Sequence, residues 1–358
     1  MTRNPTDFGL PAVSQTLPCP VNAHNEWDPI EEIIVGDPSF GRWPAGDLGF
    51  ERAARGDAFP TGPLPERVIE ETREDIEAFV EVLTGLGIRV RRARPQPPHA
   101  LAFAGWQTER FFTYCPRDVL LTIGDTVIES PNAFRSRACE AHAYTELLVE
   151  YLRGGARWIA APRPRLDAAT YAGDAETGSM LAETEPVFDA ANVVRAGRDL
   201  FYQVSDSGNL LGARWLQSTL GDGYRVHACR GLYRGFHLDT TLVMLRPGLV
   251  LINPERVSDD NLPPLLRSWD RIVAPPMVHV AYSDLKPLGS AWIGMNVLML
   301  RPDLAVVDRN QTPLIRLLEK HGIEVVPGLL RHGRTLGGGF HCITADVRRR
   351  GALESYFD

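Results

Sequence analysis

The sequence has few cysteines, and those that it has are scattered. None forms a CxxC pair among Cys19, Cys115, Cys139, Cys229 and Cys342. A disulfide framework needs an even, closely spaced set, and a structural zinc site needs paired cysteines or histidines, so neither is expected. This cysteine usage indicates a reducing compartment, and we expect a cytoplasmic protein.

The sequence also lacks basic excess and long apolar runs. Its 38 Lys and Arg residues against 45 Asp and Glu residues give a net charge of -7, which argues against a nucleic-acid partner. No apolar run is long enough for a membrane span, and the first residues lack the apolar region of a signal peptide. No HExxH, EF-hand, P-loop or dinucleotide fingerprint is present, so we expect neither a cofactor nor a bound metal.

The composition is that of a globular protein, with 44% hydrophobic and 23% charged residues. The length of 358 residues is about twice the usual length of one domain. It allows two domains or one large closed architecture. We interpret residues 1–25 as an arm without periodicity, followed by a body over residues 26–358. Residues 37–65 are rich in Gly and Pro and suggest a long irregular loop.

A degenerate ββαβ pattern recurs along the body. Four hairpins begin near residues 119, 193, 241 and 297, and their turns carry Gly or Pro. Helices are expected over 141–153, 209–220, 260–269 and 312–320. A first, fragmentary copy has strands at 33–35 and 88–90 and a helix over 65–86. Five such units suggest a ring without exposed strand edges; the alternative is two α/β sheets in two domains.

Chemistry is suggested first by the segment from Leu336 to Cys342, where three consecutive glycines precede a cysteine. Glycines let the backbone approach a ligand, and a reactive cysteine needs access. A buried structural cysteine after a flexible turn is the alternative.

Acidic residues and a histidine stand where the hairpins begin. Asp118 precedes the second copy, Asp189 the third, and His237 with Asp239 the fourth. Each alone is more often a turn or cap residue. In a ring these starts converge, bringing carboxylates, an imidazole and a thiol together. Several carboxylates suit a guanidinium substrate.

Two further residues are candidates for binding a substrate carboxylate. Arg256 follows the fourth hairpin and could clamp it, and Ser290 enters the fifth copy and could donate a hydrogen bond. A surface salt bridge and a loop serine are the alternatives. A metal held by His237, Asp239 and Asp189 is a weaker interpretation, because no metal-ligand spacing supports it.

Together these residues resemble the L-arginine-dependent amidinotransferases, which include glycine and inosamine-phosphate amidinotransferases. The resemblance runs from about Val21 to the end of the chain. The matching segments are Val21 to Pro29, Cys115 to Asp118, Phe188 to Ala191, His237 to Asp239, Trp292 to Asn296, and Gly337 to Cys342 leading into Asp346 to Arg349. It implies a pentein-like α/β fold: a five-bladed propeller of ββαβ modules in one domain. It also implies small-molecule substrates and makes a homodimer possible.

The resemblance implies a two-step mechanism with ping-pong kinetics. Cys342 would attack the guanidino carbon of arginine, ornithine would leave, and an acceptor amine would then take the amidino group. His237 would be the general acid and base, with Asp189 orienting it. Asp118 and Asp239 would bind the guanidinium nitrogens, and Arg256 and Ser290 the amino-acid carboxylate.

A few positions in the sequence indicate which amine accepts the amidino group. Residues 204–209 and 292–296 look nearer to the inosamine-phosphate branch. Phe236, just before the histidine, is bulkier than the residue that this branch implies, and Gly289-Ser290 resembles the glycine branch. A narrowed pocket favours a small amino acid such as glycine, which is our expectation; the alternative is an aminocyclitol phosphate.

Two other functions are weighed against amidino transfer. A hydrolase such as an arginine deiminase would use the same Cys, His and Asp set with water as the acceptor, giving citrulline. A non-catalytic arginine-binding protein on the same fold is less favoured, because Cys342, His237 and Asp189 are all present.

Overall fold

Five sheets of three strands share one pattern in the computed structural model, which describes residues 18–57, 60–173 and 178–357. In each, the middle strand pairs antiparallel with one neighbour and parallel with the other. In spatial order the strands are β19 (Thr344–Arg349), β1 (Ile30–Val35) and β4 (Arg89–Arg92); β7 (Leu120–Ile123), β8 (Thr126–Glu129) and β9 (Arg157–Ala160); β10 (Val193–Ala196), β11 (Asp199–Gln203) and β12 (Arg225–Cys229); β13 (Leu242–Arg246), β14 (Leu249–Ile252) and β15 (Asp270–Val273); and β16 (Leu298–Arg301), β17 (Leu304–Asp308) and β18 (Glu324–Gly328).

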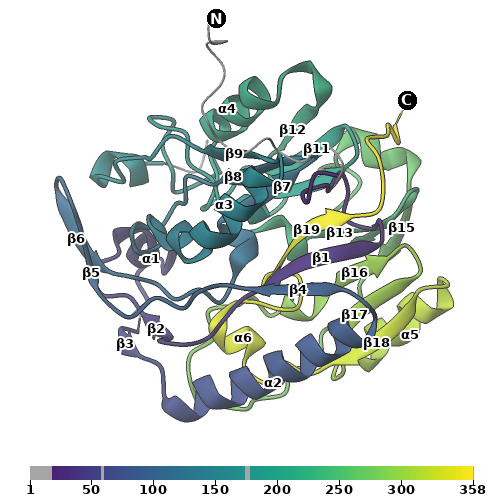
Figure 1. Cartoon of the computed structure of the whole chain (residues 1–358), viewed down its shortest axis with the longest axis horizontal. Coiled ribbons are helices and arrows are strands. Elements are labelled where there is room, and N and C mark those ends of the chain that lie inside the picture. Colours follow the sequence, from purple (N-terminus) through teal and green to yellow (C-terminus); the bar gives the residue numbers. More distant parts are fainter. Residues whose placement is uncertain (1–17, 58–59, 174–177, 358) are drawn as a thin grey trace, which may run out of the picture.

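The first sheet draws its strands from distant parts of the chain. β19 pairs antiparallel with β1, with Thr344 opposite Val35 and Arg349 opposite Ile30, and the two lie side by side in Figure 1. The other four sheets follow the hairpins expected from the sequence. The sequence left the first copy incomplete because its missing strand comes from residues 344–349.

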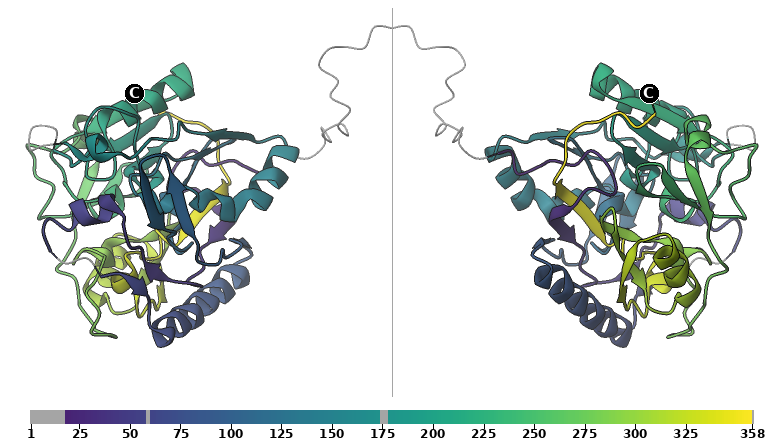
Figure 2. Two further views of the ribbon diagram at one scale, coloured as in Figure 1. Left: turned by 90° about the vertical axis from the view of Figure 1, so that its left-hand side faces the viewer. Right: turned by 90° about the vertical axis from the view of Figure 1, so that its right-hand side faces the viewer.

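Helices connect the parallel strands, as such strands require a crossover. They are α2 (Glu66–Gly85), α3 (Thr145–Arg153), α4 (Leu210–Leu220) and α5 (Thr312–Lys320). α2, α4 and α5 lie at the periphery (Figure 1), and α2 stays at the lower edge in both side views of Figure 2. No helix in the described ranges is long and apolar enough to cross a membrane.

The prediction of a helix over residues 260–269 is wrong. This crossover is instead a short 3₁₀ helix, Pro264–Ser268. Pro263 and Pro264 lack the amide hydrogens that an α-helix needs, and each disfavours the helical conformation of the residue before it.

Residues 37–65 hold more structure than the expected loop. They include α1 (Leu48–Ala53), which Asp47 caps through its carboxylate, and the strand pair β2 (Arg42–Trp43) and β3 (Gly62–Pro63). Two more elements are the hairpin of β5 (Ala100–Phe103) and β6 (Trp106–Glu109) and the short helix α6 (Gly333–Leu336).

Part of the expected N-terminal arm packs on the body. Residues 1–17 lie outside the described residues. Val21 and Ala23 are buried, the Asn22 amide donates to the Val347 carbonyl at 3.0 Å, and Ala23 pairs with Gly124. The domain boundary at residue 25 stays a prediction.

A buried network of charged side chains links three of the sheets. Asp346, on β19, accepts hydrogen bonds from Arg349 on the same strand, from Arg195 on β10 and from Arg117 before β7. Arg195 also pairs with Glu26, its Nε lying 2.8 Å from the carboxylate. Burial alone would raise the pKa of Asp346, but the three guanidinium groups hold it well below its usual value. The carboxylate therefore stays charged.

One face of α2 supports the segment that carries Cys342. Ile76, Phe79 and Leu83 recur at helical spacing and are buried. The Phe79 ring meets the Phe340 ring edge to face, with centroids 5.0 Å apart. The helix thus fixes the turn two residues before the thiol.

Candidate active site

A short turn precedes the first strand of each sheet, and each turn carries a polar side chain toward the others. Four of them are 3₁₀ helices, namely Pro116–Asp118, Ala190–Asn192, Leu238–Thr240 and Ile293–Met295. The fifth is the turn over residues 340–343 before β19. Asp118, Asp189, His237, Asp239 and Cys342 come from four of these turns, and the contacts below bring all five together, as the hairpin pattern predicts.

The thiol of Cys342 sits between a carboxylate and an amide. Its Sγ donates to Asp239 Oδ2 at 3.2 Å and accepts from Asn296 Nδ2 at 3.1 Å. Asn296 Oδ1 in turn accepts the backbone amides of His341 and Cys342, both at 2.9 Å. Asn296 therefore fixes both the turn and the sulfur.

No role for Asn296 was predicted from the sequence, although the matching segment from Trp292 ends on it. Its place at the entrance of the fifth hairpin is the signal that could have found it. A side chain on Gly339 would place its Cβ 2.6 Å from the Asn296 Cβ, so this close approach requires glycine.

His237 is held between two carboxylates. Its Nε2 lies 3.0 Å from Asp189 Oδ2 and its Nδ1 lies 3.5 Å from Asp118 Oδ1. Burial alone would lower the pKa of His237, but the charge of Asp118 and the hydrogen bond and charge of Asp189 raise it to about 9. The imidazole is therefore a cation at neutral pH and can donate a proton.

The carboxylates beside His237 are themselves anchored. Asp189 Oδ1 accepts from Asn132 Nδ2 at 2.9 Å, and Asp118 Oδ2 lies 2.6 Å from Arg137. Burial would raise the pKa of Asp189, but the hydrogen bond and charge of His237 lower it. Asp118 Oδ1 is buried without a hydrogen-bond partner, so it can accept one from a substrate.

His341 takes part in the site. In an extended chain the side chain next to Cys342 would point to the opposite face, whereas residues 340–343 form a turn. The His341 Nδ1 lies 2.9 Å from Asp239 Oδ2, the oxygen that also meets the thiol. Burial would raise the pKa of Asp239, but His341 above all keeps it below its usual value.

The resting thiol is protonated. Burial raises the pKa of Cys342 well above its ordinary value, and the nearby charge of Asp239 raises it further. A cation bound beside the sulfur would act in the opposite direction and favour the thiolate. The arrangement therefore suits a nucleophile that is activated by a cationic substrate.

A cavity of about 410 Å³ reaches the thiol, a size within the usual range for small-molecule sites. His237, Asp239, Cys342, Phe236 and Ser290 are among the residues that line it.

The two residues expected to bind a carboxylate lie together. Arg256 donates to the Ser290 hydroxyl at 2.7 Å and lies over the Tyr233 ring, 3.5 Å from its centroid. Ser290 lines the cavity, whereas Arg256 is not among the residues that line it. The ring of Phe236 stands edge-on to Phe134, with centroids 5.2 Å apart, so it forms a fixed part of the cavity wall.

A metal is a second possible occupant of these residues. Asp118, His237 and Cys342 each present a ligand atom within 4.8 Å of the others. The imidazole of His237, however, stays a cation until the pH exceeds its pKa of about 9. An imidazolium has no free nitrogen lone pair with which to bind a metal. The set suits proton transfer better than metal binding.

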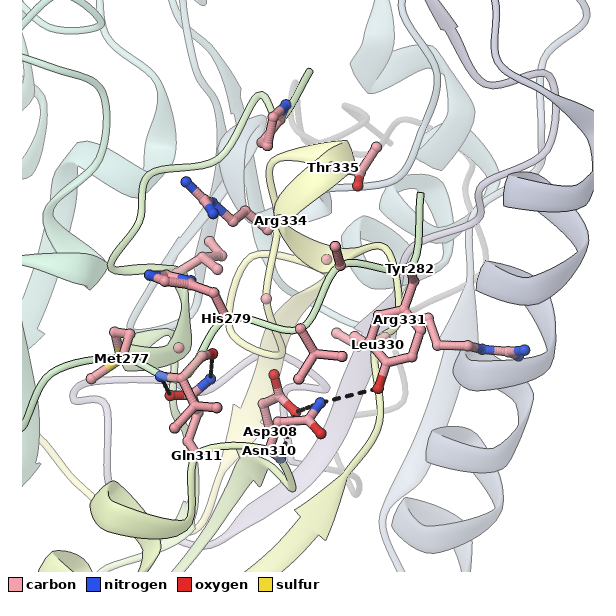
Figure 3. A pocket seen from close by; sticks show the side chains of 18 of the residues that line it. Met277, His279, Tyr282, Asp308, Asn310, Gln311, Leu330, Arg331, Arg334 and Thr335 are labelled. Atoms are coloured by element: carbon pink, nitrogen blue, oxygen red, sulfur yellow. Dashed lines mark hydrogen bonds between the residues drawn. The ribbon is translucent and has the colours of Figure 1, made fainter. Parts of the chain in front are cut away.

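A second cavity has a volume of about 170 Å³. Asn296, Gly339 and Phe340, which lie next to the turn that carries Cys342, are among the residues that line it. Figure 3 shows Asp308 and Asn310 on one side of it and Arg334 and Thr335 on the opposite side. Neither Cys342 nor His237 lines it. The reactive groups therefore face the larger cavity.

Comparison with known proteins gives no match to a protein-family profile. Inosamine-phosphate amidinotransferase 1 of Streptomyces glaucescens is 55% identical over 343 residues, covering 94% of this chain and 99% of its own. The mitochondrial glycine amidinotransferase of Gallus gallus is 34% identical over 366 residues, covering 95% of this chain and 85% of its own.

Solved structures agree with this. Inosamine-phosphate amidinotransferase of Streptomyces griseus superposes with a TM-score of 0.90 at 53% identity, covering 94% of this chain and 99% of that one. The dimethylarginine dimethylaminohydrolase of Pseudomonas aeruginosa shares the α/β fold alone, with a TM-score of 0.58 at 14% identity and coverage of 88% and 98%. The chain therefore belongs to the amidinotransferase family and is an enzyme that transfers amidino groups.

Proposed function

We propose that the enzyme moves the amidino group of L-arginine through an amidino-cysteine at Cys342 to an aminocyclitol phosphate, releasing L-ornithine. One set of contacts in a single cavity carries this proposal. The buried thiol of Cys342 donates a hydrogen bond to Asp239, and beside it the imidazolium of His237 lies between two aspartates.

In the first half-reaction the substrate guanidinium binds beside Asp118 and Asp239. Asp118 Oδ1 supports this role because it is buried and, within the part of the chain that the structure describes, accepts no hydrogen bond. The bound cation favours loss of the thiol proton, which Asp239 Oδ2 is placed to accept at 3.2 Å. A carbon–sulfur bond forms, the bond to the ornithine nitrogen breaks, and His237 donates a proton to that nitrogen.

In the second half-reaction the acceptor amine attacks the amidino carbon. Its proton passes to His237, now neutral. The carbon–sulfur bond breaks, and the thiolate takes its proton back from Asp239, which restores the resting thiol. Asp189 orients His237 throughout. Arg256 and Ser290 would hold the amino-acid carboxylate, with the Ser290 hydroxyl facing the cavity.

The acceptor proposed here differs from the small amino acid expected from Phe236. The relative at 55% identity is named for inosamine phosphate, whereas the glycine amidinotransferase is 34% identical. Two arginines, Arg55 and Arg234, line the same cavity as Phe236. Their positive charge suits an acceptor that carries a phosphate group.

For the fold, we infer that the five three-stranded sheets are blades of one propeller, in a single domain over residues 26–358. The charged network around Asp346 supports this, since its arginines come from two sheets and from the turn that leads into a third. The pairing of β19 with β1 supports closure.

The acceptor is tested by incubating the enzyme with L-arginine and one amine at a time: an aminocyclitol phosphate, glycine or lysine. We expect ornithine and a matching guanidino product from the aminocyclitol phosphate. A guanidino product from glycine alone would restore the small-acceptor hypothesis. Citrulline formed without any amine would mean a hydrolase.

The pH dependence tests the role of His237. Because its pKa is raised, the imidazolium persists until the pH passes about 9. We expect kcat/KM for arginine to fall above that pH, as the proton donor is lost. Asp189→Asn removes the charge that helps to raise this pKa, so the fall should move to lower pH, toward 6.5.

The matched control is Asp303→Asn, at an exposed ion pair with Arg301, which should leave the pH profile unchanged. An Asp189→Asn profile that coincides with the wild-type profile would contradict the assigned proton donor.

A further inference from the structure

Two arginines in the cavity of Cys342 converge on one aspartate. An Nη of Arg55 lies 2.8 Å from Asp206 Oδ2, and the Nε of Arg234 lies 3.7 Å from Asp206 Oδ1. All three residues line the same cavity as His237 and Cys342. Two positive charges therefore face one negative charge, so this part of the cavity carries a net positive charge that a bound anion could neutralise.

Asp206 is fixed, whereas the guanidinium groups are open to solvent. The Asp206 side chain is 4% exposed, its Oδ1 accepts the Met180 amide at 2.7 Å, and its own amide donates to the Arg234 carbonyl at 2.9 Å. The side chains of Arg55 and Arg234 are 56% and 44% exposed. The carboxylate aims the arginines and leaves most of their N–H groups unused.

Arg234 is the less satisfied of the two. Its approach to Asp206 is too long for a hydrogen bond, and no other acceptor contacts its side chain among the described residues. Nearby, Lys286 and Asp57 form a one-to-one pair at 3.0 Å. Local charge neutralisation therefore does not explain the two arginines on one carboxylate.

The backbone of Arg55 adopts an unfavourable conformation, although its side chain is held by Asp206. It follows the end of α1 with a φ of 53°, in the left-handed region that usually selects glycine, and Gly56 stands next to it. Strain of this kind persists where the structure over-determines it and clusters at ligand clamps. Arg55 thus keeps its guanidinium over the cavity at a conformational cost.

We propose that Arg55 and Arg234 form a clamp for the phosphate group of the acceptor. Two planar guanidinium groups match the oxygens of a phosphate monoester, which they bind through paired hydrogen bonds. Binding there holds the acceptor at the exposed end of the cavity while its amine faces Cys342. This inference rests on the proposed function, and it implies that a phosphorylation precedes the amidino transfer.

The test compares two acceptors, an aminocyclitol phosphate and hydroxylamine, a small amine without a phosphate. The variants are Arg55→Ala, Arg234→Ala and Arg234→Lys, with Arg316→Ala on the exposed face of α5 as the matched control. Each alanine variant should raise KM for the phosphorylated acceptor by about 10- to 100-fold, the usual effect of losing charged hydrogen bonds.

The preference for the phosphorylated acceptor over hydroxylamine should fall by a similar factor. Arg234→Lys should recover only part of it, because lysine keeps the charge but not the planar fork. Arg316→Ala should keep the wild-type preference, and thermal melting of each variant establishes that it is folded.

The outcomes separate this inference from the proposed function. A wild-type enzyme that uses hydroxylamine but not the aminocyclitol phosphate would overturn the proposed acceptor. A wild-type enzyme that uses the aminocyclitol phosphate, with folded arginine variants that keep its KM, would overturn the clamp alone. Inorganic phosphate should compete with the acceptor in the wild type and lose this effect in Arg234→Ala.

Discussion

Cys342→Ala is expected to abolish ornithine release while the protein still binds L-arginine. The thiol is the one group in the contact set that can form a covalent bond to the guanidino carbon, so its loss should lower kcat by roughly 10⁴-fold or more. Single-turnover assays measure ornithine, and calorimetry measures arginine binding. In the wild type, arginine alone should leave an amidino adduct on Cys342, detectable by mass spectrometry of the intact protein.

The matched control is Cys139→Ala, a half-buried free cysteine that does not line the cavity. It should keep the wild-type rate and the adduct. Substantial turnover by Cys342→Ala, or an adduct on another residue, would rule out the covalent mechanism.

Asp346→Ala should have the largest effect on stability. It leaves Arg117, Arg195 and Arg349 buried without the carboxylate that all three contact. Breaking a buried ion pair by removing one partner typically costs about 3–5 kcal/mol. Since three guanidinium groups are affected, we expect a loss at the upper end of that range, measured by denaturant unfolding.

The comparison variant is Asp303→Ala, which breaks the exposed pair with Arg301 and should cost under about 1 kcal/mol. If Asp346→Ala unfolds at the wild-type denaturant concentration, the network is not a source of stability.

The sequence predicted most of the strands because their turns are local. Hairpins that turn at Gly124, Gly197 or Gly248 are set by adjacent residues, and all three glycines adopt positive φ. The partner of β1 could not be found in this way, since it lies about 300 positions along the chain and only the tertiary fold brings it back.

The candidate site was predictable to the same extent. Residue types at hairpin entrances pointed to Asp118, Asp189 and His237, and the run of glycines pointed to Cys342. The structure brings these four residues together. The contacts of Asn296 and His341 were missed, because they depend on a turn whose shape comes from Phe340 packing on α2. In the fourth copy of the ββαβ pattern, two adjacent prolines prevent the expected α-helix. The apolar residues of that segment had suggested a helix in spite of them.

The pairing of β19 with β1 also sets an order of events during synthesis. β1 leaves the ribosome early and must wait for β19, which at about 5–20 residues per second takes tens of seconds. Until then β1 lacks its antiparallel partner, an edge that can recruit another strand. The same delay withholds the thiol, because Cys342 is translated just before β19. The nascent chain therefore acquires its nucleophile only when the strand that completes the first sheet is about to follow.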